Sequence, residues 1–415
     1  MLLDTLIKTA KESFDINQEK LIEVIELLKN EEDVTKEYLI SKGIPEENTR
    51  GIINLFKSLN IVHIRYAYEC DLQEGESEIA GSLKEECIFC ENIIQDCNYH
   101  LIKELYTLKD TIIKEVEDME KKALEDVMDN LYLLNFEKLK GELNNIVPFL
   151  GSGVSIPLGL PNWTDLISKM IEGLTNPSDT EQFEEYIKEG DIFNAIDILQ
   201  KESLTYRTED QIKSFIRDYI NKNFRENLEK EYHNINDILE LNSDFYVTTN
   251  YDSALSHYKN KFSYPFVLND LKILQELYSE KDQRIIHLHG IVDKKDSMVV
   301  TEADYERLYN DEKNKSILSG IMASKSFLFI GFSFTDRYFV DMYKLLRSHI
   351  GGDHYIILAD LNRHKAQRII DEGLIPISIN VKKLKTEKKF ANEINNEYSQ
   401  RFVNSLKVLI KNLLK

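Results

Sequence analysis

The sequence predicts an α/β protein with a doubly wound, mostly parallel sheet and a helical insertion, preceded by a mostly α-helical module. Two observations lead to this prediction. Short, wholly apolar runs such as IVPFL at 146–150 are followed by sequence with a helical period, which is typical of buried parallel strands. Residues 1–69 instead carry several helical periods before one alternating run. A chain of 415 residues is long enough for two or three domains.

The first module is predicted over residues 1–100. LIEVIELLKN has a helical period, Thr35 can cap the helix KEYLISKG, and Gly43 can end it. A further helix over 45–60 precedes IVHIRYAYE, which alternates like a strand. This order of helices and strand resembles a winged helix. Because acidic residues outnumber basic ones over 1–69, we favour a protein-contact or packing module over one that reads DNA.

The four cysteines of the chain fall in one short segment, as Cys70, Cys87, Cys90 and Cys97, with His100 three residues beyond the last. A CxxC pair with one thiolate upstream and a Cys or His downstream can close a tetrahedral zinc shell. We therefore predict a zinc site of Cys70, Cys87 and Cys90, with either Cys97 or His100 as the fourth ligand. The alternative is a set of ordinary buried cysteines around the start of a helix.

A single long connecting helix is predicted over residues 101–139. Apolar residues follow one another there at steps of three and four, as a helical stripe requires. They are Leu105, Leu108, Ile112, Val116, Met119, Ala123 and Val127. Such a helix either packs on a domain or joins two subunits, and the first is commoner.

The apolar run IVPFL ends in GSGVS at 151–155, and a helical period follows from LPNW at 160–163. This is a turn from a strand into a helix. Glycine has no Cβ, so a phosphate can approach the amide groups of such a turn closely. Glycine-rich turns also occur where a strand and a helix simply pack closely, and both interpretations stay open at this point.

Three further strands end in polar residues: TTNYD at 248–252, HLHG at 287–290 and GFSFTD at 331–336. In a doubly wound sheet, ligands bind outside the carboxyl ends of the strands. The four strand ends together therefore predict a ligand site. Taken singly, each has a structural alternative, since Asp252 can cap the following helix and His289 can be a core residue.

The order and spacing of these motifs resemble the sirtuin superfamily, and more closely its bacterial sirtuin-like branch found in antiphage defence. GSGVS with LPNW looks like GAGxS and xIPxW, TTNYD like TxNxD, HLHG like the catalytic His-Gly, and GFSFTD like GxSxxD. The resemblance covers residues 140–385. It implies a Rossmann-like domain that binds NAD and breaks the bond between nicotinamide and ribose.

The resemblance also assigns NAD-binding residues, position by position. The glycine turn would line the pyrophosphate through Gly151, Ser152, Gly153 and Ser155. The adenosine side would be lined by Gly331, Ser333 and Asp336.

Three residues carry the implied chemistry. Asn250 would orient a water through its amide, and Asp252 would hold the carboxamide of nicotinamide. His289 would accept a proton from a ribose hydroxyl or from that water, since an unperturbed histidine has a pKa of about 6.5. Nicotinamide leaves as a neutral group from a cation, so the protein mainly positions the ribose and stabilises an oxocarbenium-like transition state.

The expected function is that of an NAD glycohydrolase, a defence effector that depletes cellular NAD when triggered. No cysteine follows Cys97, so the four-cysteine zinc module of deacylating sirtuins is absent, which favours NAD hydrolysis over peptide deacylation. One alternative is a non-catalytic sensor of NAD or an ADP-ribose-type ligand that signals to a partner protein. A weaker one is a residual ADP-ribosyl or acyl transfer activity.

The remaining expectations concern the rest of the chain and its surroundings. Residues 173–240 are predicted as a helical insertion beside the site, and 386–415 as a solvated closing helix. The N-terminus has no signal-peptide pattern, so we expect a cytoplasmic protein. A formal charge of −20 makes the bulk surface unsuited to nucleic acid. We also expect a homo-oligomer, a triggering partner protein, or both.

Overall fold

The computed structural model describes residues 2–14, 16–29, 31–73, 75–259, 265–271, 284–332, 340, 343–344, 347, 352–382 and 397–415. The chain divides into two compact units, Met1–Lys122 and Ala123–Lys415. The boundary falls within helix α5 (Asp110–Val127). Among the described helices, none is long and apolar enough to cross a membrane.

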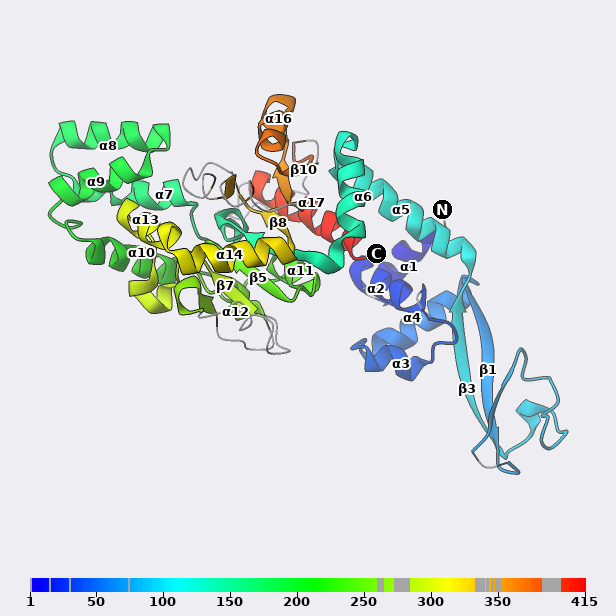
Figure 1. Cartoon of the computed structure of the whole chain (residues 1–415). Coiled ribbons are helices and arrows are strands. Elements are labelled where there is room, and N and C mark those ends of the chain that lie inside the picture. The colour runs from blue at the N-terminus through cyan, green and yellow to red at the C-terminus, as the bar shows by residue number, and fades with distance from the viewer. Residues whose placement is uncertain are drawn as a thin grey trace. The chain divides into compact units, whose positions relative to one another are not determined.

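The first unit begins with four helices, α1 (Leu2–Phe14), α2 (Gln18–Lys29), α3 (Lys36–Ser41) and α4 (Glu46–Ser58). An antiparallel sheet of order β2-β1-β3 follows, made of β1 (Val62–Cys70), β2 (Ser77–Ala80) and β3 (His100–Leu108) (Figure 1). The helices expected before residue 60 and the strand after it are confirmed. Thr35 caps α3 as expected, because its hydroxyl accepts a hydrogen bond from the Tyr38 amide at 3.1 Å.

The prediction of one helix over 101–139 is wrong. Residues 100–108 form β3, which pairs with β1 in the register Val62 with Leu108 and Cys70 with His100. After α5 the chain makes a short 3₁₀ turn, Asn130–Tyr132, before α6 (Leu133–Gly141) begins. Leu105 and Leu108, the first two residues of the apolar stripe, lie in β3. Their spacing is compatible with a helix or a strand, and pairing with β1 favours the strand.

The second unit is built on a seven-stranded sheet of order β10-β9-β8-β4-β5-β7-β6. Each described pair of neighbours is parallel, which confirms the predicted sheet. The strands are β4 (Ile146–Leu150), β5 (Phe245–Thr248), β6 (Phe266–Val267), β7 (Arg284–His287), β8 (Ser326–Ile330), β9 (Tyr355–Ala359) and β10 (Ile375–Ile379). The chain leaves β4 toward β5 on one side, and β8 toward β9 on the other. The reversal of strand order therefore lies between the neighbours β4 and β8, where doubly wound sheets bind ligands.

Alternate residues of β4 reach two separate cores, one on each face of the sheet. Val147 and Phe149 join the core with α13 (Glu302–Asn310), α14 (Glu312–Ser324) and α16 (Arg363–Asp371). Ile146 and Leu150 join the core with α6, α11 (Ile235–Glu240) and α17 (Glu397–Leu413). A strand buried on both faces is apolar throughout, which is why IVPFL carries no alternation.

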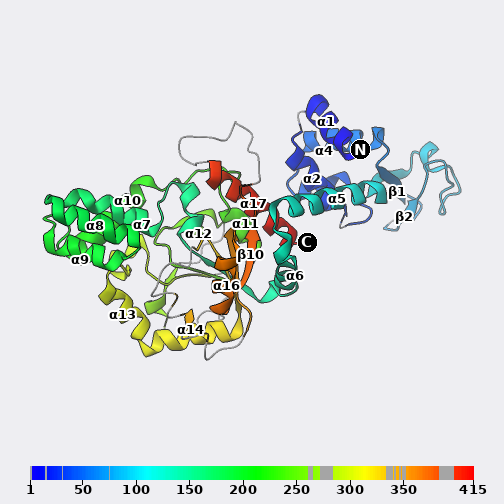
Figure 2. The ribbon, with the colours of Figure 1, turned by 90° about the horizontal axis from the view of Figure 1, so that it is seen from above.

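The insertion predicted over 173–240 is helical, with α8 (Pro177–Glu189), α9 (Ile192–Glu202) and α10 (Glu209–Asn223). These helices and the preceding α7 (Trp163–Ser168) share a core with later residues of the chain, among them Tyr251, Val267 and Ile291. In both views α8, α9 and α10 lie at one end of the second unit, and α6 and α17 lie at the other (Figures 1 and 2). The expectation of a solvated closing helix is wrong, because α17 buries Val403, Leu406, Leu409, Ile410 and Leu413. Apolar residues at steps of three and four place these side chains on one face of α17.

Candidate functional site

The turns after β4 and β8 press against each other at the reversal of strand order. The Gly153 amide donates to the Gly331 carbonyl at 2.9 Å. A Cβ added at Gly153 would lie 2.8 Å from that carbonyl oxygen, and one added at Gly151 would lie 2.7 Å from it. Gly331 itself has φ +76, and an added Cβ there would meet the Val154 amide nitrogen at 2.7 Å. The bare turn is therefore required by close packing of two loops, whatever ligand it also meets.

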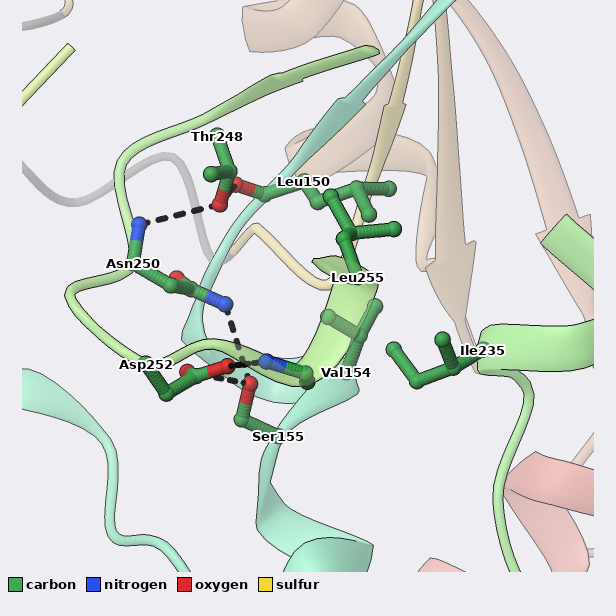
Figure 3. Close-up of a pocket in the computed structure, with 9 residues that line it drawn as sticks. Leu150, Val154, Ser155, Ile235, Thr248, Asn250, Asp252 and Leu255 are labelled. Atoms are coloured by element: carbon green, nitrogen blue, oxygen red, sulfur yellow. Dashed lines mark hydrogen bonds between the residues drawn. The ribbon is translucent and has the colours of Figure 1, made fainter. Parts of the chain in front are cut away.

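The loop after β5 places two polar side chains beside the glycine turn. The Asn250 amide donates to the Gly151 carbonyl at 3.0 Å and to the Ser155 hydroxyl at 3.1 Å. The Ser155 hydroxyl in turn donates to the Asp252 carboxylate at 2.8 Å. Figure 3 shows Asn250 and Asp252 converging on Ser155 from one loop. Three predicted site residues that are up to 97 positions apart in the chain thus form one hydrogen-bonded network.

The start of this loop is fixed by Thr248, whose hydroxyl sequence reasoning did not single out. That hydroxyl donates to the Leu150 carbonyl at 3.0 Å and accepts from the Asn250 amide N–H at 3.0 Å. It therefore ties the carboxyl ends of β4 and β5 together and sets the backbone of Asn250. Thr248 is the first residue of TTNYD, so the motif itself carried the signal.

A small pocket opens at this network, with about 200 Å³ of empty space. It is lined by Leu150, Val154, Ser155, Ile235, Thr248, Asn250, Asp252, Ala254 and Leu255 (Figure 3). Part of this space is open solvent, and ligand pockets usually measure ~300–1,000 Å³, so the pocket as it stands is too small for NAD. The hydrogen-bonded side chains form the polar side of the pocket, and the other lining residues are apolar.

Asp252 is held buried, with both carboxylate oxygens hydrogen-bonded. One oxygen accepts from Ser155, and the other accepts from the Ala254 amide at 3.0 Å. Burial raises the pKa of the Asp252 carboxyl, while these two hydrogen bonds oppose the shift. Asp252 thus accepts from the first backbone amide of helix α12 (Ala254–Tyr258), next to the N-cap residue Ser253, and also contacts the network. The two roles share one side chain.

His287 is a second buried titratable group here, and sequence reasoning did not select it. Its Nδ1 lies 2.8 Å from the Asn250 carbonyl oxygen, to which it must donate. Its Nε2 is buried without a hydrogen-bond partner among the described residues. Burial lowers the pKa of His287, while the Asn250 carbonyl and the Asp252 charge oppose the shift. HLHG contains two histidines, and the resemblance pointed only to the second.

His289 lies inside the protein with 3% of its surface exposed. Its Nε2 is within hydrogen-bonding distance of the Tyr309 hydroxyl, and its Nδ1 lies 3.5 Å from the Tyr305 hydroxyl. The two tyrosines are four residues apart on α13, so they share one face of that helix. Gly290 follows with φ +83, and an added Cβ there would meet the Ser297 carbonyl oxygen at 2.1 Å. Nothing in the local sequence indicated that α13 would cover His289.

The position of α13 is fixed at its first turn. The Thr301 hydroxyl accepts from the Asp304 amide at 3.3 Å, and the Asp304 carboxylate accepts from the Thr301 amide at 3.2 Å. Lys213, buried on α10 of the insertion, forms an ion pair with Asp304 at 3.0 Å. Removing one partner of such a buried pair would leave the other charge unpaired, so it fastens α13 to the insertion.

The other predicted binding residues are placed only in part. Ser152 is half-buried in the glycine turn, and its carbonyl accepts from the Ser155 amide at 3.0 Å. Ser333 and Asp336 lie outside the described residues. Of the three residues predicted to line the adenosine side, the structure therefore describes only Gly331.

The cysteine segment forms a separate cluster in the first unit. Ligand atoms of Cys70, Cys87, Cys90 and His100 all lie within 4.8 Å of one another. Cys97 lies outside this cluster, so of the two alternatives for a fourth ligand the structure brings His100 to the other three. A cluster of this composition could hold a metal ion.

A parallel, doubly wound sheet with polar groups gathered at its carboxyl ends is the architecture of ligand-binding α/β domains. Comparison with known proteins agrees, because residues 244–377 match the family model of the SIR2-like domain. The protein called NAD(+) hydrolase ThsA from Enterococcus faecium is 30% identical over 226 residues, which are 52% of this chain and 44% of that protein. The protein of the same name from Cytobacillus dafuensis is 26% identical over 55% of this chain and 44% of its own. The resemblance to sirtuin-like proteins is confirmed over about half of the chain, and the chain spans less than half the length of these relatives.

Proposed function

We propose that this protein is an NAD glycohydrolase that cleaves NAD to nicotinamide and ADP-ribose. The observation that carries the proposal is the network of Asn250, Ser155 and Asp252 at the carboxyl ends of β4 and β5, of which Asn250 and Asp252 lie within the match to the SIR2-like domain at 244–377. The names of the similar proteins support the same activity. The catalytic part would be residues 140–385.

Each polar group of the network has a task in this proposal. Asn250, held by the Gly151 carbonyl and Ser155, would orient a water toward the ribose carbon that loses nicotinamide. Asp252 would hold the nicotinamide carboxamide, and its buried charge would favour the developing oxocarbenium ion. His289 would accept the proton of the water or of a ribose hydroxyl. The glycine turn and the residues after β8 would bind the pyrophosphate and adenosine of NAD.

The test is to incubate the full chain with NAD and to separate nicotinamide, ADP-ribose and cyclic ADP-ribose by chromatography. Asn250→Ala should lower the rate of NAD cleavage by about 10²-fold or more, because a positioned polar group contributes that much to such a step. Asn412→Ala is the matched control, since Asn412 loses a single hydrogen bond to the Val408 carbonyl on α17. Unchanged cleavage by Asn250→Ala would remove the catalytic assignment. NAD binding with no turnover by the unmodified protein at any protein concentration would instead favour the sensor.

We further propose that the activity is triggered and serves defence by depleting NAD. With 3% of its surface exposed beneath two tyrosines, His289 is closed to a ligand, so α13 would have to move before NAD could reach it. A partner protein or self-association, acting through a winged-helix-like first module, would stabilise the open arrangement by its difference in affinity for the two states. NAD cleavage measured over a range of protein concentrations tests self-association, because specific activity should then rise with concentration.

A further inference from the structure

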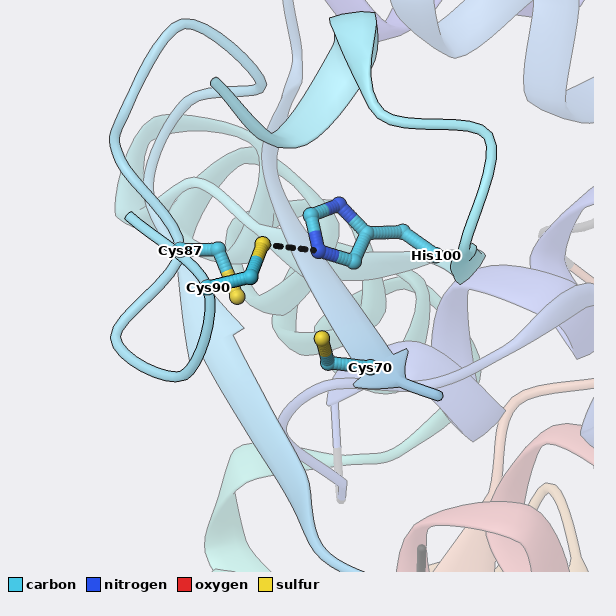
Figure 4. Close-up of side chains that lie close together, drawn as sticks. All are labelled: Cys70, Cys87, Cys90 and His100. Atoms are coloured by element: carbon cyan, nitrogen blue, oxygen red, sulfur yellow. Dashed lines mark hydrogen bonds between the residues drawn. The ribbon is translucent and has the colours of Figure 1, made fainter. Parts of the chain in front are cut away.

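The cluster of Cys70, Cys87, Cys90 and His100 belongs to the first unit and takes no part in the proposed NAD chemistry. Cys70 is the last residue of β1 and His100 the first residue of β3, and the two are paired directly across the sheet. Cys87 and Cys90 come from the long segment that joins these strands. Four side chains from two strand ends and one loop therefore meet at one end of the antiparallel β1–β3 pair (Figure 4).

The distances suit a tetrahedral metal shell. With Zn–S of about 2.3 Å and Zn–N of about 2.0 Å, neighbouring ligand atoms in such a shell are about 3.5–3.8 Å apart. The Cys90 Sγ lies 3.3 Å from the His100 Nε2, and no pair in the cluster exceeds 4.8 Å. Adjustments of about 1 Å or less, within the reach of side-chain rotation, would bring all four to one ion.

The backbone around the CxxC pair is already folded as a tight turn that points both thiols inward. The Glu91 amide donates to the Cys87 carbonyl at 2.9 Å, and Glu91 adopts φ +59. The Phe89 amide is directed at the Cys87 sulfur, 3.4 Å away. An N–H aimed at sulfur stabilises a thiolate, which is the form that binds metal.

The histidine is oriented for the same purpose. The Nδ1 of His100 lies 2.9 Å from the Ile94 carbonyl oxygen, and because a carbonyl can only accept, Nδ1 carries the proton. In the neutral ring the lone pair is then on Nε2, the nitrogen that faces the sulfurs (Figure 4). A backbone carbonyl that fixes the tautomer in this way is the usual support of a metal-bound histidine.

Apart from the pairing of β2 with β1, the segment between β1 and β3 has only a small core. Its buried residues Ala80, Cys87 and Ile94 pack with Tyr68 and Cys70 of β1. Several of its large apolar side chains are exposed instead, namely Leu72, Ile79, Ile88 and Tyr99. Segments of this size without a sufficient core are stabilised by disulfides or metals, and the four cysteines here are free thiols.

We propose that Cys70, Cys87, Cys90 and His100 bind one zinc ion, which fastens residues 71–99 to one end of the antiparallel β1–β3 pair. Three thiolates and one imidazole are the soft ligand set that zinc prefers. Four protein ligands fill the tetrahedron and leave no position for water or substrate, so the ion is structural. Cys97 is outside the shell.

The first test measures metal content in the full chain purified without added zinc. The unmodified protein and Cys97→Ser should each hold close to one zinc per chain, whereas Cys90→Ser and His100→Ala should hold close to none. Replacement by cobalt should give the intense visible bands of tetrahedral thiolate coordination. A folded, metal-free unmodified protein would overturn the proposal, as would a Cys97→Ser protein that loses zinc while His100→Ala retains it.

A second test keeps the proposal falsifiable if a cysteine variant fails to fold. The unmodified full chain is treated with a zinc chelator and then subjected to limited proteolysis, with the cleavage sites identified by mass spectrometry. Removal of zinc should create new cleavage sites within residues 71–99, and added zinc should suppress them. Equal resistance of this segment with and without zinc would show that no metal fastens it.

Discussion

Substitution of Gly153 by alanine tests whether the bare turn after β4 serves packing. The new Cβ would lie 2.8 Å from the Gly331 carbonyl oxygen and 2.9 Å from the Gly331 Cα, and neither backbone atom can rotate away. Overpacking of this kind costs about 1–3 kcal/mol. Separating the loops also strains the hydrogen bond from the Gly153 amide to Gly331, worth about 1 kcal/mol. We therefore expect the free energy of unfolding of the second unit to fall by about 2–4 kcal/mol.

Urea unfolding without NAD measures this effect. Trp163, the single tryptophan of the chain, lies in α7 of the second unit and reports its unfolding by fluorescence. Gly141→Ala is the matched control, because nothing lies within 4 Å of its added Cβ, and it should be neutral or stabilising by up to ~1 kcal/mol. If Gly153→Ala unfolds at the same urea concentration as the unmodified protein yet no longer binds NAD, the glycine serves the ligand and the packing argument is wrong.

Two predictions concern the buried titratable groups of the site. Burial raises the pKa of Asp252, so its ionisation destabilises the fold as pH rises from about 4; Asp252→Asn should then gain stability relative to the unmodified protein between pH 4 and pH 7 while losing NAD cleavage. Urea unfolding at the two pH values checks this, and a constant difference would contradict it. Burial lowers the pKa of His287, so its titration costs the fold nothing above about pH 6.5 and destabilises the fold as the pH falls below that value. Thermal melting at pH 7.5 and 5.5 should show a smaller acid loss in His287→Gln, although burial lowers the pKa values of His233 and His354 too and they keep part of the effect.

The local sequence pattern was sufficient to predict those elements for which the tertiary surroundings favour the same secondary structure. Wholly apolar runs such as IVPFL became buried parallel strands, and Thr35 capped the helix that its position predicted. The pattern was insufficient at residues 100–108, where an apolar spacing compatible with a helix was decided by antiparallel pairing with β1. It was also insufficient for α17, whose apolar face is visible in sequence but whose docking on the sheet is a tertiary contact.

The candidate site, too, could be predicted from the sequence only in part. Asn250 and Asp252 stand at a strand end in the sequence, and the parallel sheet necessarily brings that end to the glycine turn. The cover of Tyr305 and Tyr309 over His289 could not be predicted, because a helix with two tyrosines four residues apart does not specify what its face will meet. Likewise, the choice of His100 over Cys97 depended on strand register, which pairs His100 with Cys70.

The stability cost of Asp252 argues that its position is more than a helix cap. An asparagine at that place could accept the Ala254 amide equally well and would carry no charge into the interior. Burial raises the pKa of Asp252, so its ionised form is destabilising where it stands. Beside it, the Nε2 of His287 is buried with no partner among the residues that the structure describes. Two neighbouring groups that each lower stability are hard to explain by folding alone, and both meet Asn250 or its hydrogen-bonding partner Ser155. Such a concentration of unfavourable polar burial at the ends of the neighbouring strands β5 and β7 is expected of a site that acts on a ligand.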